Sequence, residues 1–140
     1  MKNDQRGIDR ISVARASYQA YVDKDRAAIE RLIADGFHFT SPLDNRIDRA
    51  TYFARCWPNS LTIAAYDFIH TVLEGDCVFV TYECRSTSGQ RFRNTEVLTI
   101  RDGRILEAEV YFGWDIPHDA ADGRSVDTEK PQSSSEGYPS

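Results

Sequence analysis

Two polar side chains, Asn94 and Glu96, lie two residues apart in a segment whose alternating pattern predicts a β-strand. Residues at this spacing point to the same face of a sheet. If that face is the apolar one, the carboxylate must be hydrogen-bonded, paired or protonated, because burial disfavours the charged form and raises the pKa of an acid. An acid of this kind suits proton transfer in a pocket. Glu96 is therefore the leading candidate for a catalytic residue.

The register of a predicted hairpin decides which face Glu96 occupies. Predicted strands 91–100 and 104–114 flank a turn that ends in Asp-Gly, a strong hairpin signal. With a two-residue turn, Glu96 would face Glu109, and polar and apolar groups would mix on both faces. With a three-residue turn, in which Gly103 forms a bulge, the pairing shifts by one residue and the faces separate. We expect the second register, which keeps Glu96 on the apolar face.

In this register the two faces of the hairpin differ clearly. One face is apolar apart from Asn94 and Glu96, whereas the other carries mainly charged and hydroxyl side chains and retains Val97, Ile105 and Tyr111 among them. A half-buried antiparallel sheet requires this segregation. The hydrophobic residues of the first face are Phe92, Leu98, Leu106, Ala108, Val110 and Phe112.

Helices are predicted to precede most of the sheet. Apolar residues at helical spacing predict three of them, at residues 8–22, 26–34 and 49–57. The first carries Tyr18 beside its apolar stripe, so its hydroxyl lies at the edge of the core or donates a hydrogen bond into a cavity. The third places Phe53 and Trp57 four residues apart on one face, which is typical of core packing and, in a small fold with a cavity, of a cavity wall.

Strands account for the rest of the predicted domain. Residues 37–41 form a short strand with Phe39 on its apolar side, and Asp44 follows in a loop, where Asp is common for turn geometry alone. An antiparallel meander follows the third helix, with strands at 61–73 and 77–87 and then the hairpin. Alternation points Tyr82 inward, while both faces of 61–73 are mixed and its inward face stays open.

Size and charge limit the class of function. The chain has 140 residues, 41% of them hydrophobic, which suits one domain with a real core. Its net charge of -5 and lack of a dense basic run argue against nucleic acid or anionic membranes as partners. The polar N-terminus and the absence of a long apolar run indicate a cytoplasmic protein. Cys56, Cys77 and Cys84 lack a metal-ligand spacing and there is no phosphate-binding glycine motif, so neither a metal nor a cofactor is expected.

The composition changes after Trp114. Residues 118–140 are rich in Ser, Asp, Glu, Gly and Pro and contain almost no large apolar group. Segments of this composition cannot bury enough apolar surface to fold. We therefore predict a domain at 1–116 and a disordered tail at 117–140.

The order of these elements and three motifs resemble the nuclear transport factor 2-like superfamily, and within it the SnoaL-like and ketosteroid-isomerase-like branch. The motifs are Phe-His-Phe-Thr-Ser-Pro at 37–42, Phe-Arg-Asn-Thr-Glu-Val at 92–97 and Arg-Asp-Gly-Arg-Ile at 101–105. The resemblance implies an α+β fold in which a cone-shaped, curved antiparallel sheet wraps around about three N-terminal helices and leaves an internal pocket. It also implies a homodimer, since dimers are common in this superfamily.

The resemblance carries expectations for the site as well. In the isomerases of this branch, a tyrosine on the first helix and a protonated strand acid hold an oxyanion, and an aspartate before a proline is the base. Tyr18 matches the tyrosine and Glu96 falls near the strand acid, but Ser41 stands before the proline. A serine hydroxyl cannot take a proton from an unactivated carbon at neutral pH. Ketosteroid isomerisation is therefore not expected, whereas Glu96 could itself be the base for isomerisation, cyclisation or dehydration.

These observations predict an enzyme that acts on a small apolar carbonyl or hydroxyl compound, with Glu96 and Tyr18 as catalytic residues. Two alternatives stay open: a non-catalytic binding module with the same pocket, and an interaction protein that uses the outer face of the sheet. In a purely structural role, Glu96 would instead be tied to a neighbouring helix. The predicted ligand-binding residues are Phe39, Ser41, Asp44, Phe53, Trp57, Tyr82, Asn94, Ala108, Val110 and Phe112.

The expected homodimer interface is the outer face of the sheet. That face holds Thr95, Val97, Glu109 and Tyr111 in the register adopted above. Apolar side chains that remain among charges on an otherwise exposed face are typical of a contact surface.

Overall fold

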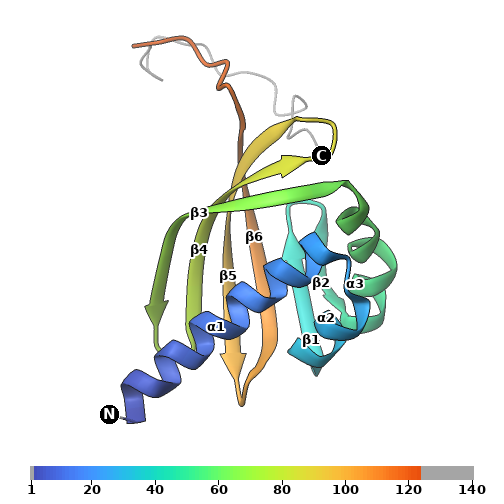
Figure 1. Cartoon of the computed structure of the whole chain (residues 1–140), viewed down its shortest axis with the longest axis vertical. Helices are drawn as coiled ribbons and strands as arrows, with labels where there is room; N and C mark the ends of the chain where they lie inside the picture. Colours follow the sequence, from blue (N-terminus) through green and yellow to red (C-terminus); the bar gives the residue numbers. More distant parts are fainter. Residues whose placement is uncertain (1, 124–140) are drawn as a thin grey trace.

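Three helices pack on a curved, six-stranded sheet in the computed structural model, which describes residues 2–123 except for the side chains of residues 2–6 and 8 (Figure 1). The helices are α1 (Lys2–Asp23), α2 (Arg26–Leu32) and α3 (Arg49–Arg55), and α3 is followed by the 3₁₀-helix η1 (Trp57–Thr62). The strands are β1 (Ile33–Ser41), β2 (Asp44–Asp48), β3 (Ile63–Glu74), β4 (Cys77–Ser86), β5 (Arg91–Arg101) and β6 (Arg104–Ile116). The predicted α+β class is confirmed.

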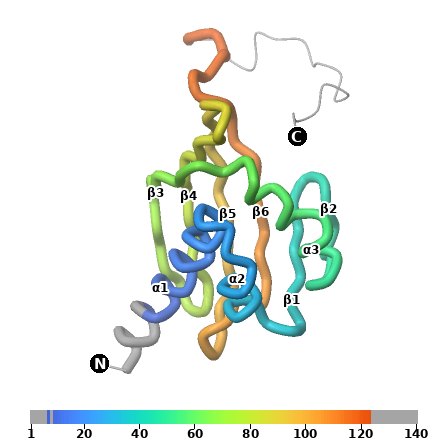
Figure 2. The backbone as a smooth tube through the Cα atoms, turned by 45° about the vertical axis from the view of Figure 1, so that its right-hand side comes forward, coloured from blue at the N-terminus to red at the C-terminus, as the bar shows by residue number. Residues whose placement is uncertain are grey.

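The strand order is β2-β1-β6-β5-β4-β3. All neighbours are antiparallel except β1 and β6, which run parallel, so the sheet is mixed rather than purely antiparallel as predicted. A register shift between Phe68 and His70 bends β3, and bulges of this kind increase the curvature of a sheet. Helix α1 lies across the concave face with α2 beside it (Figure 2).

The two short helices begin at the predicted residues, and an aspartate side chain caps each of them. The side chain of Asp25 accepts a hydrogen bond from the amide of Ala28 at 3.1 Å, and Asp48 caps α3 in the same way. Helix α2 ends earlier than predicted, because the chain is already extended at Ile33. Ile33 and Phe37 are each 2% exposed, so burial of both side chains in β1 outweighs the helical pattern that continued to residue 34.

Strand β2 is absent from the sequence-based prediction, which left Asp44 in a loop. It pairs with β1, with Ser41 opposite Asp44 and His38 opposite Asp48. The strand has five residues, and four of them are polar. Backbone pairing at the sheet edge therefore forms this strand without any apolar alternation that a sequence could reveal.

The predicted faces of the β5–β6 hairpin are right, but its pairing and its turn are not. A three-residue turn at 101–103 would pair Glu96 with Ala108, whereas Glu96 pairs with Val110 in the body of the hairpin. The two pairings differ by two residues, so both turn Glu96 to the apolar face. At the tip, however, Asp102 and Gly103 form a two-residue turn with positive φ angles of 52° and 76°. The one-residue shift comes from a bulge at Leu106 rather than from Gly103. Ile105 therefore points inward and is 3% exposed, contrary to its predicted place on the outer face.

The core fills the space between the helices and the concave face. Ala14 and Tyr18 on α1 meet the inward row of β4, in which Val78, Val80 and Tyr82 are each at most 4% exposed. No described helix is long and apolar enough to cross a membrane.

The predicted tail lies largely outside the described residues, which end at residue 123. Within the described part, the ring of His118 stacks on Trp114 with the ring centroids 4.9 Å apart. This contact falls at the predicted boundary between domain and tail.

Candidate functional site

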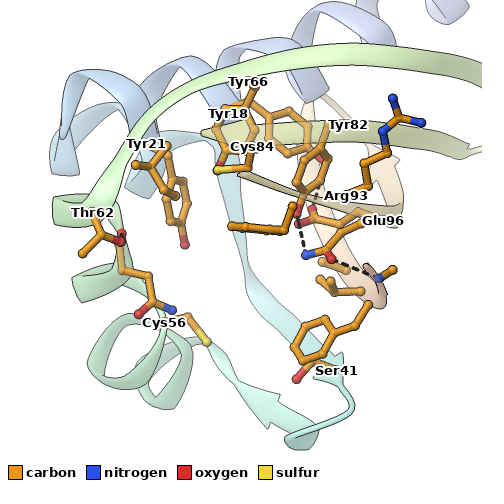
Figure 3. A pocket seen from close by; sticks show the side chains of 18 of the residues that line it. Tyr18, Tyr21, Ser41, Cys56, Thr62, Tyr66, Tyr82, Cys84, Arg93 and Glu96 are labelled. Carbon is orange, nitrogen blue, oxygen red and sulfur yellow. Dashed lines mark hydrogen bonds between the residues drawn. The ribbon is translucent and has the colours of Figure 1, made fainter. Parts of the chain in front are cut away.

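A pocket of about 1090 Å³ opens on the concave side of the sheet, between α1, α3 and the strands (Figure 3). Its wall is mainly aromatic and aliphatic, with a few polar groups directed into it. Such a composition is typical of sites for small molecules. Among the lining residues are Tyr18, Tyr21, Phe39, Ser41, Asp44, Tyr52, Arg55, Cys56, Tyr66, Tyr82, Phe92, Asn94, Glu96, Ala108, Val110 and Phe112.

The carboxylate of Glu96 is the centre of the main polar group in this pocket. The hydroxyl of Tyr18 donates a hydrogen bond to Oε1 at 2.9 Å, and the hydroxyl of Tyr82 donates to Oε2 at 2.9 Å. Tyr18 comes from α1, Tyr82 from β4 and Glu96 from β5. Three separate elements therefore hold one carboxylate in a fixed orientation.

Asn94 extends this group by orienting Tyr82. The side-chain amide of Asn94 donates to the Tyr82 hydroxyl at 3.4 Å, and its oxygen accepts from the backbone amide of Gly113 at 3.2 Å. A glycine is needed at 113, because a Cβ there would collide with the backbone carbonyl of Arg93. Hydrogen bonds that run in one direction, from Gly113 through Asn94 and Tyr82 to Glu96, reinforce one another.

The environment of Glu96 raises its pKa above the ordinary value of 4.5. Burial is the larger cause, and the hydrogen bonds from Tyr18 and Tyr82 oppose it by stabilising the carboxylate. Burial also raises the pKa of both tyrosines, so they remain neutral donors at physiological pH. A carboxyl group with a raised pKa and neutral partners can take up and release a proton without losing its position.

Edge-to-face contacts hold the tyrosines in place. The ring of Tyr66, from β3, lies 4.9 Å from that of Tyr18 and 5.1 Å from that of Tyr82, centroid to centroid. Such aromatic pairs stabilise a packed arrangement beyond the burial of their area. The three rings gather around Glu96 in Figure 3, so the donors of the carboxylate sit in a rigid cluster.

A second set of polar groups lies away from Glu96. Asp44 accepts a hydrogen bond from the Ser41 hydroxyl at 3.1 Å and forms an ion pair with Arg55, whose Nη2 lies 2.7 Å from Oδ1. The hydroxyls of Tyr21 and Tyr52, which also line the pocket, are hydrogen-bonded to each other. Figure 3 shows Ser41 apart from the cluster around Glu96.

Cys56 lies in the pocket but is a poor nucleophile. Burial raises the pKa of its thiol to about 11, and the Asp44 carboxylate adds to the effect while Arg55 opposes it. Since the thiolate is the reactive form, the thiol is inert at neutral pH. Within residues 2–123, no three His, Cys, Asp or Glu side chains are placed to hold a metal ion.

The structure brings most of the predicted site residues into this pocket. Glu96, Tyr18 and eight of the predicted ligand-binding residues line it, namely Phe39, Ser41, Asp44, Tyr82, Asn94, Ala108, Val110 and Phe112. Phe53 and Trp57 lie outside the lining. Phe53 is 6% exposed beneath the guanidinium groups of Arg26 and Arg49, and Trp57 packs edge-on against Tyr21.

Sequence reasoning missed Tyr66, Tyr52 and Arg55 as lining residues. Tyr66 lies on β3, both faces of which carry mixed residues. The pairing of Tyr66 with Cys84 in β4 settles its direction, because Cys84 belongs to the inward row. Arg55 ends a surface helix, and nothing in its sequence context indicates that it reaches Asp44.

Comparison with known proteins places this geometry in context. The family model of the SnoaL-like domain matches residues 14–108. A search of curated proteins finds no match. Among solved structures, 197 chains match, and the three described below are all less than 25% identical to this chain, so they show the fold alone.

A LEH-like epoxide hydrolase from M. tuberculosis is 17% identical, with a TM-score of 0.66 over 77% of this chain and 85% of that one. A SnoaL-like protein from Jannaschia sp. CCS1, assigned as a polyketide cyclase, is 14% identical with a TM-score of 0.65, over 74% and 85%. A protein from Streptomyces antibioticus with the same assignment is 20% identical with a TM-score of 0.58, over 72% and 89%.

Proposed function

Because the chain belongs to the SnoaL-like domain family, we propose that it binds a small apolar molecule with a carbonyl or hydroxyl group and acts on it as an enzyme. The reaction is of the isomerase, cyclase or dehydratase type. One observation carries the proposal: the Glu96 carboxyl group lies in a largely apolar pocket between two tyrosine hydroxyls, each 2.9 Å away. The assignments of the Jannaschia and Streptomyces proteins as polyketide cyclases support it.

Each polar group of the cluster has a distinct role in this proposal. Glu96 takes a proton from a carbon or oxygen of the ligand and later returns it, because its raised pKa makes it a stronger base than an ordinary glutamate. Tyr18 and Tyr82 hold the carboxylate and stabilise it when it is charged. Asn94 fixes the direction of the Tyr82 hydroxyl. Ser41, which stands before Pro42, is not needed as a base.

Proton exchange on a simple ketone tests the proposal. We expect the protein to accelerate exchange of the α-protons of β-tetralone in deuterium oxide, followed by proton NMR, because Glu96 can remove a proton next to the carbonyl. Glu96→Gln keeps the shape of the side chain but cannot move the proton, so exchange should fall to the uncatalysed rate. Acceleration that is equal in wild type and Glu96→Gln contradicts the role of Glu96.

A non-catalytic binding module is the second candidate, and one observation favours it. Both oxygens of Glu96 already accept hydrogen bonds from tyrosines, so the carboxylate is satisfied without a ligand. Fluorescence titration with p-phenylphenol, a rigid apolar molecule with one hydroxyl, separates the two candidates. Binding of p-phenylphenol without exchange of β-tetralone would favour the binding module over the enzyme.

The outer face of the sheet supports a homodimer as a further part of the proposal. Val72, Phe79 and Tyr111 on this face are 54%, 37% and 56% exposed. Phe79 pairs with Val72 on one side and with Val97 on the other, so the apolar groups form a continuous row across β3, β4 and β5. A second copy that covers this row would remove it from water. Light scattering at tens of micromolar should give a dimer mass, and a monomer mass would refute the interface.

A further inference from the structure

Asp44 is the unusual polar group of the pocket outside the Glu96 cluster. Its side chain is 9% exposed, although it stands at the start of an edge strand. Oδ2 accepts from the Ser41 hydroxyl at 3.1 Å. Oδ1 lies 2.7 Å from Arg55 Nη2, but this ion pair is not a hydrogen bond, so within the described part of the chain Oδ1 has no hydrogen-bond donor. The ion pair offsets part of the cost of burying this oxygen, and Oδ1 can still accept a hydrogen bond from a ligand.

The sheet places Asp44 and Glu96 in one row. Ser41 pairs with Asp44, Thr40 pairs with Glu109, and Glu96 pairs with Val110. Ser41 is therefore level with Val110, and the row runs Asp44, Ser41, Val110, Glu96 across four strands. At a strand spacing of about 4.8 Å, the backbones of Asp44 and Glu96 are about 14 Å apart along the sheet. All four residues line the pocket.

The part of this row between Ser41 and Glu96 is apolar. Val110 lies at its centre, and Phe39, Ala108 and Phe112 flank it on the same concave face. A ligand that contacts Glu96 and extends along the row therefore passes over hydrophobic side chains before it reaches Ser41. A rigid apolar body with a polar group at each end matches this sequence of environments.

We propose that Asp44 and Arg55 form a second polar subsite, which binds a hydroxyl group at the end of the ligand remote from Glu96. This inference rests on the proposed function and adds the chemical class of the ligand, an apolar molecule with two separated oxygen groups. A hydroxyl is the group that fits, because it donates to the Asp44 carboxylate and accepts from the guanidinium of Arg55. The side chain of Arg55 is 58% exposed, so the subsite lies toward the mouth of the pocket.

Two matched probes test the subsite. p-Phenylphenol carries one hydroxyl, and the biphenyl diol with a hydroxyl at each para end carries a second one on the same rigid body. We expect wild type to bind the diol about tenfold more tightly in fluorescence titrations, the factor that one additional hydrogen bond to a charged group supplies. Equal affinities for the two probes would overturn the proposal.

Two variants of the subsite sharpen the test. Asp44→Asn removes the charge and keeps the shape, so the advantage of the diol should fall to about twofold or less. Arg55→Met keeps the apolar stem of a half-exposed side chain, should fold normally, and should also reduce the advantage. This second variant decides the question if Asp44→Asn does not fold. If a folded Asp44→Asn still binds the diol as much more tightly as wild type does, the ion pair of Asp44 and Arg55 is only structural. If Asp44→Asn does not fold, the same result in Arg55→Met has the same meaning.

Glu96→Gln is the matched control at the other end of the row. It should weaken the binding of both probes and leave the ratio of their affinities unchanged, because it acts on the shared end of the ligand. If Asp44→Asn abolishes the tighter binding of the diol and Glu96→Gln changes the affinity for neither probe, the subsite is supported and the proposed function is contradicted. If Glu96→Gln weakens the binding of both probes and Asp44→Asn keeps the tighter binding of the diol, the proposed function is supported and the subsite is contradicted. A wild-type protein that binds neither probe contradicts both.

Discussion

Two glutamates on neighbouring strands of one sheet have opposite electrostatic surroundings. Glu96 on β5 faces the pocket, and its partners are the neutral hydroxyls of Tyr18 and Tyr82. Glu83 on β4 faces the outer side, and its oxygens accept from the guanidinium groups of Arg91 at 2.7 Å and Arg93 at 3.4 Å. Burial raises the pKa of the first, whereas the hydrogen bond and charge of Arg91 lower the pKa of the second.

The difference shows what makes a carboxyl group available for chemistry. A guanidinium partner favours the charged form, so Glu83 holds its two arginines but has little tendency to take up a proton. Neutral donors orient the Glu96 carboxylate without adding a compensating charge, and burial keeps its affinity for a proton. Both are hydrogen-bonded glutamates in strands, and the face of the sheet decides which of them can act as an acid or base.

The largest expected effect comes from removing each carboxylate in turn. Glu96→Gln should lower the affinity for p-phenylphenol about tenfold or more, since it replaces a charged acceptor inside the pocket. Glu83→Gln should leave that affinity within about twofold, because Glu83 faces away from the pocket. Fluorescence titration of both variants measures the difference. Equal losses of affinity for p-phenylphenol would show that the face of the sheet does not distinguish the two glutamates.

Removal of single tyrosine hydroxyls should give a smaller effect. Tyr18→Phe or Tyr82→Phe leaves Glu96 with one donor, so the pKa of Glu96 rises further and the pH profile of β-tetralone exchange moves to higher pH. Tyr111→Phe, on the outer face at 56% exposure, is the control and should not move the profile. A profile that stays fixed in all three variants would show that the hydrogen bonds do not tune Glu96.

The two glutamates should affect stability with opposite dependence on pH. The folded-state pKa of Glu96 lies above 4.5, so the folded protein binds the proton more tightly, and its contribution to stability falls as the pH rises from 4.5 through the folded-state value. The folded-state pKa of Glu83 lies below 4.5, so its contribution is present above 4.5 and is lost as the pH falls through the folded-state value. Urea unfolding of wild type, Glu96→Gln and Glu83→Gln between pH 3 and pH 7 measures the two differences, which should have opposite slopes.

Deletion of residues 118–140 should have the smallest effect. The deletion removes the stack of His118 on Trp114 but none of the hydrogen-bond partners of Glu96 or Glu83. The thermal midpoint should fall by less than about 5 °C, which corresponds to about 1 kcal/mol in a domain of this size. A larger fall would show that the predicted tail packs on the domain.

The sequence predicts the face of Glu96 correctly because a shift of one residue turns every side chain of a strand to the other face. A pairing shifted by one residue keeps Glu96 away from Glu109 and places the apolar residues together, and the structure has a shifted pairing with the predicted faces. The alternation of the residues does not determine where the extra residue lies. A bulge at Gly103 and a bulge at Leu106 shift the pairing by one residue in opposite directions, so both turn Glu96 to the apolar face, and only the second turns Ile105 inward.

The second end of the pocket was harder to predict, for two physical reasons. Strand β2 forms by backbone pairing at an edge and has a polar sequence, so no alternation marks Asp44 as a strand residue. Phe53 and Trp57 show the opposite error, because they were predicted to line the pocket and lie outside its lining. Their spacing predicts a common helix face, but α3 ends at Arg55 and Trp57 begins η1. Core and pocket wall demand the same residue types, and only the packing distinguishes the two.

Carboxyl-resolved NMR titration of Glu96 and Glu83 in one sample tests the central claim most directly, because the two side chains share a sheet and a solvent. We expect a pKa above 4.5 for Glu96 and below 4.5 for Glu83. Glu96→Gln and Glu83→Gln assign the two resonances. A pKa for Glu96 at or below 4.5 would contradict its proposed role as the acid–base group of the pocket.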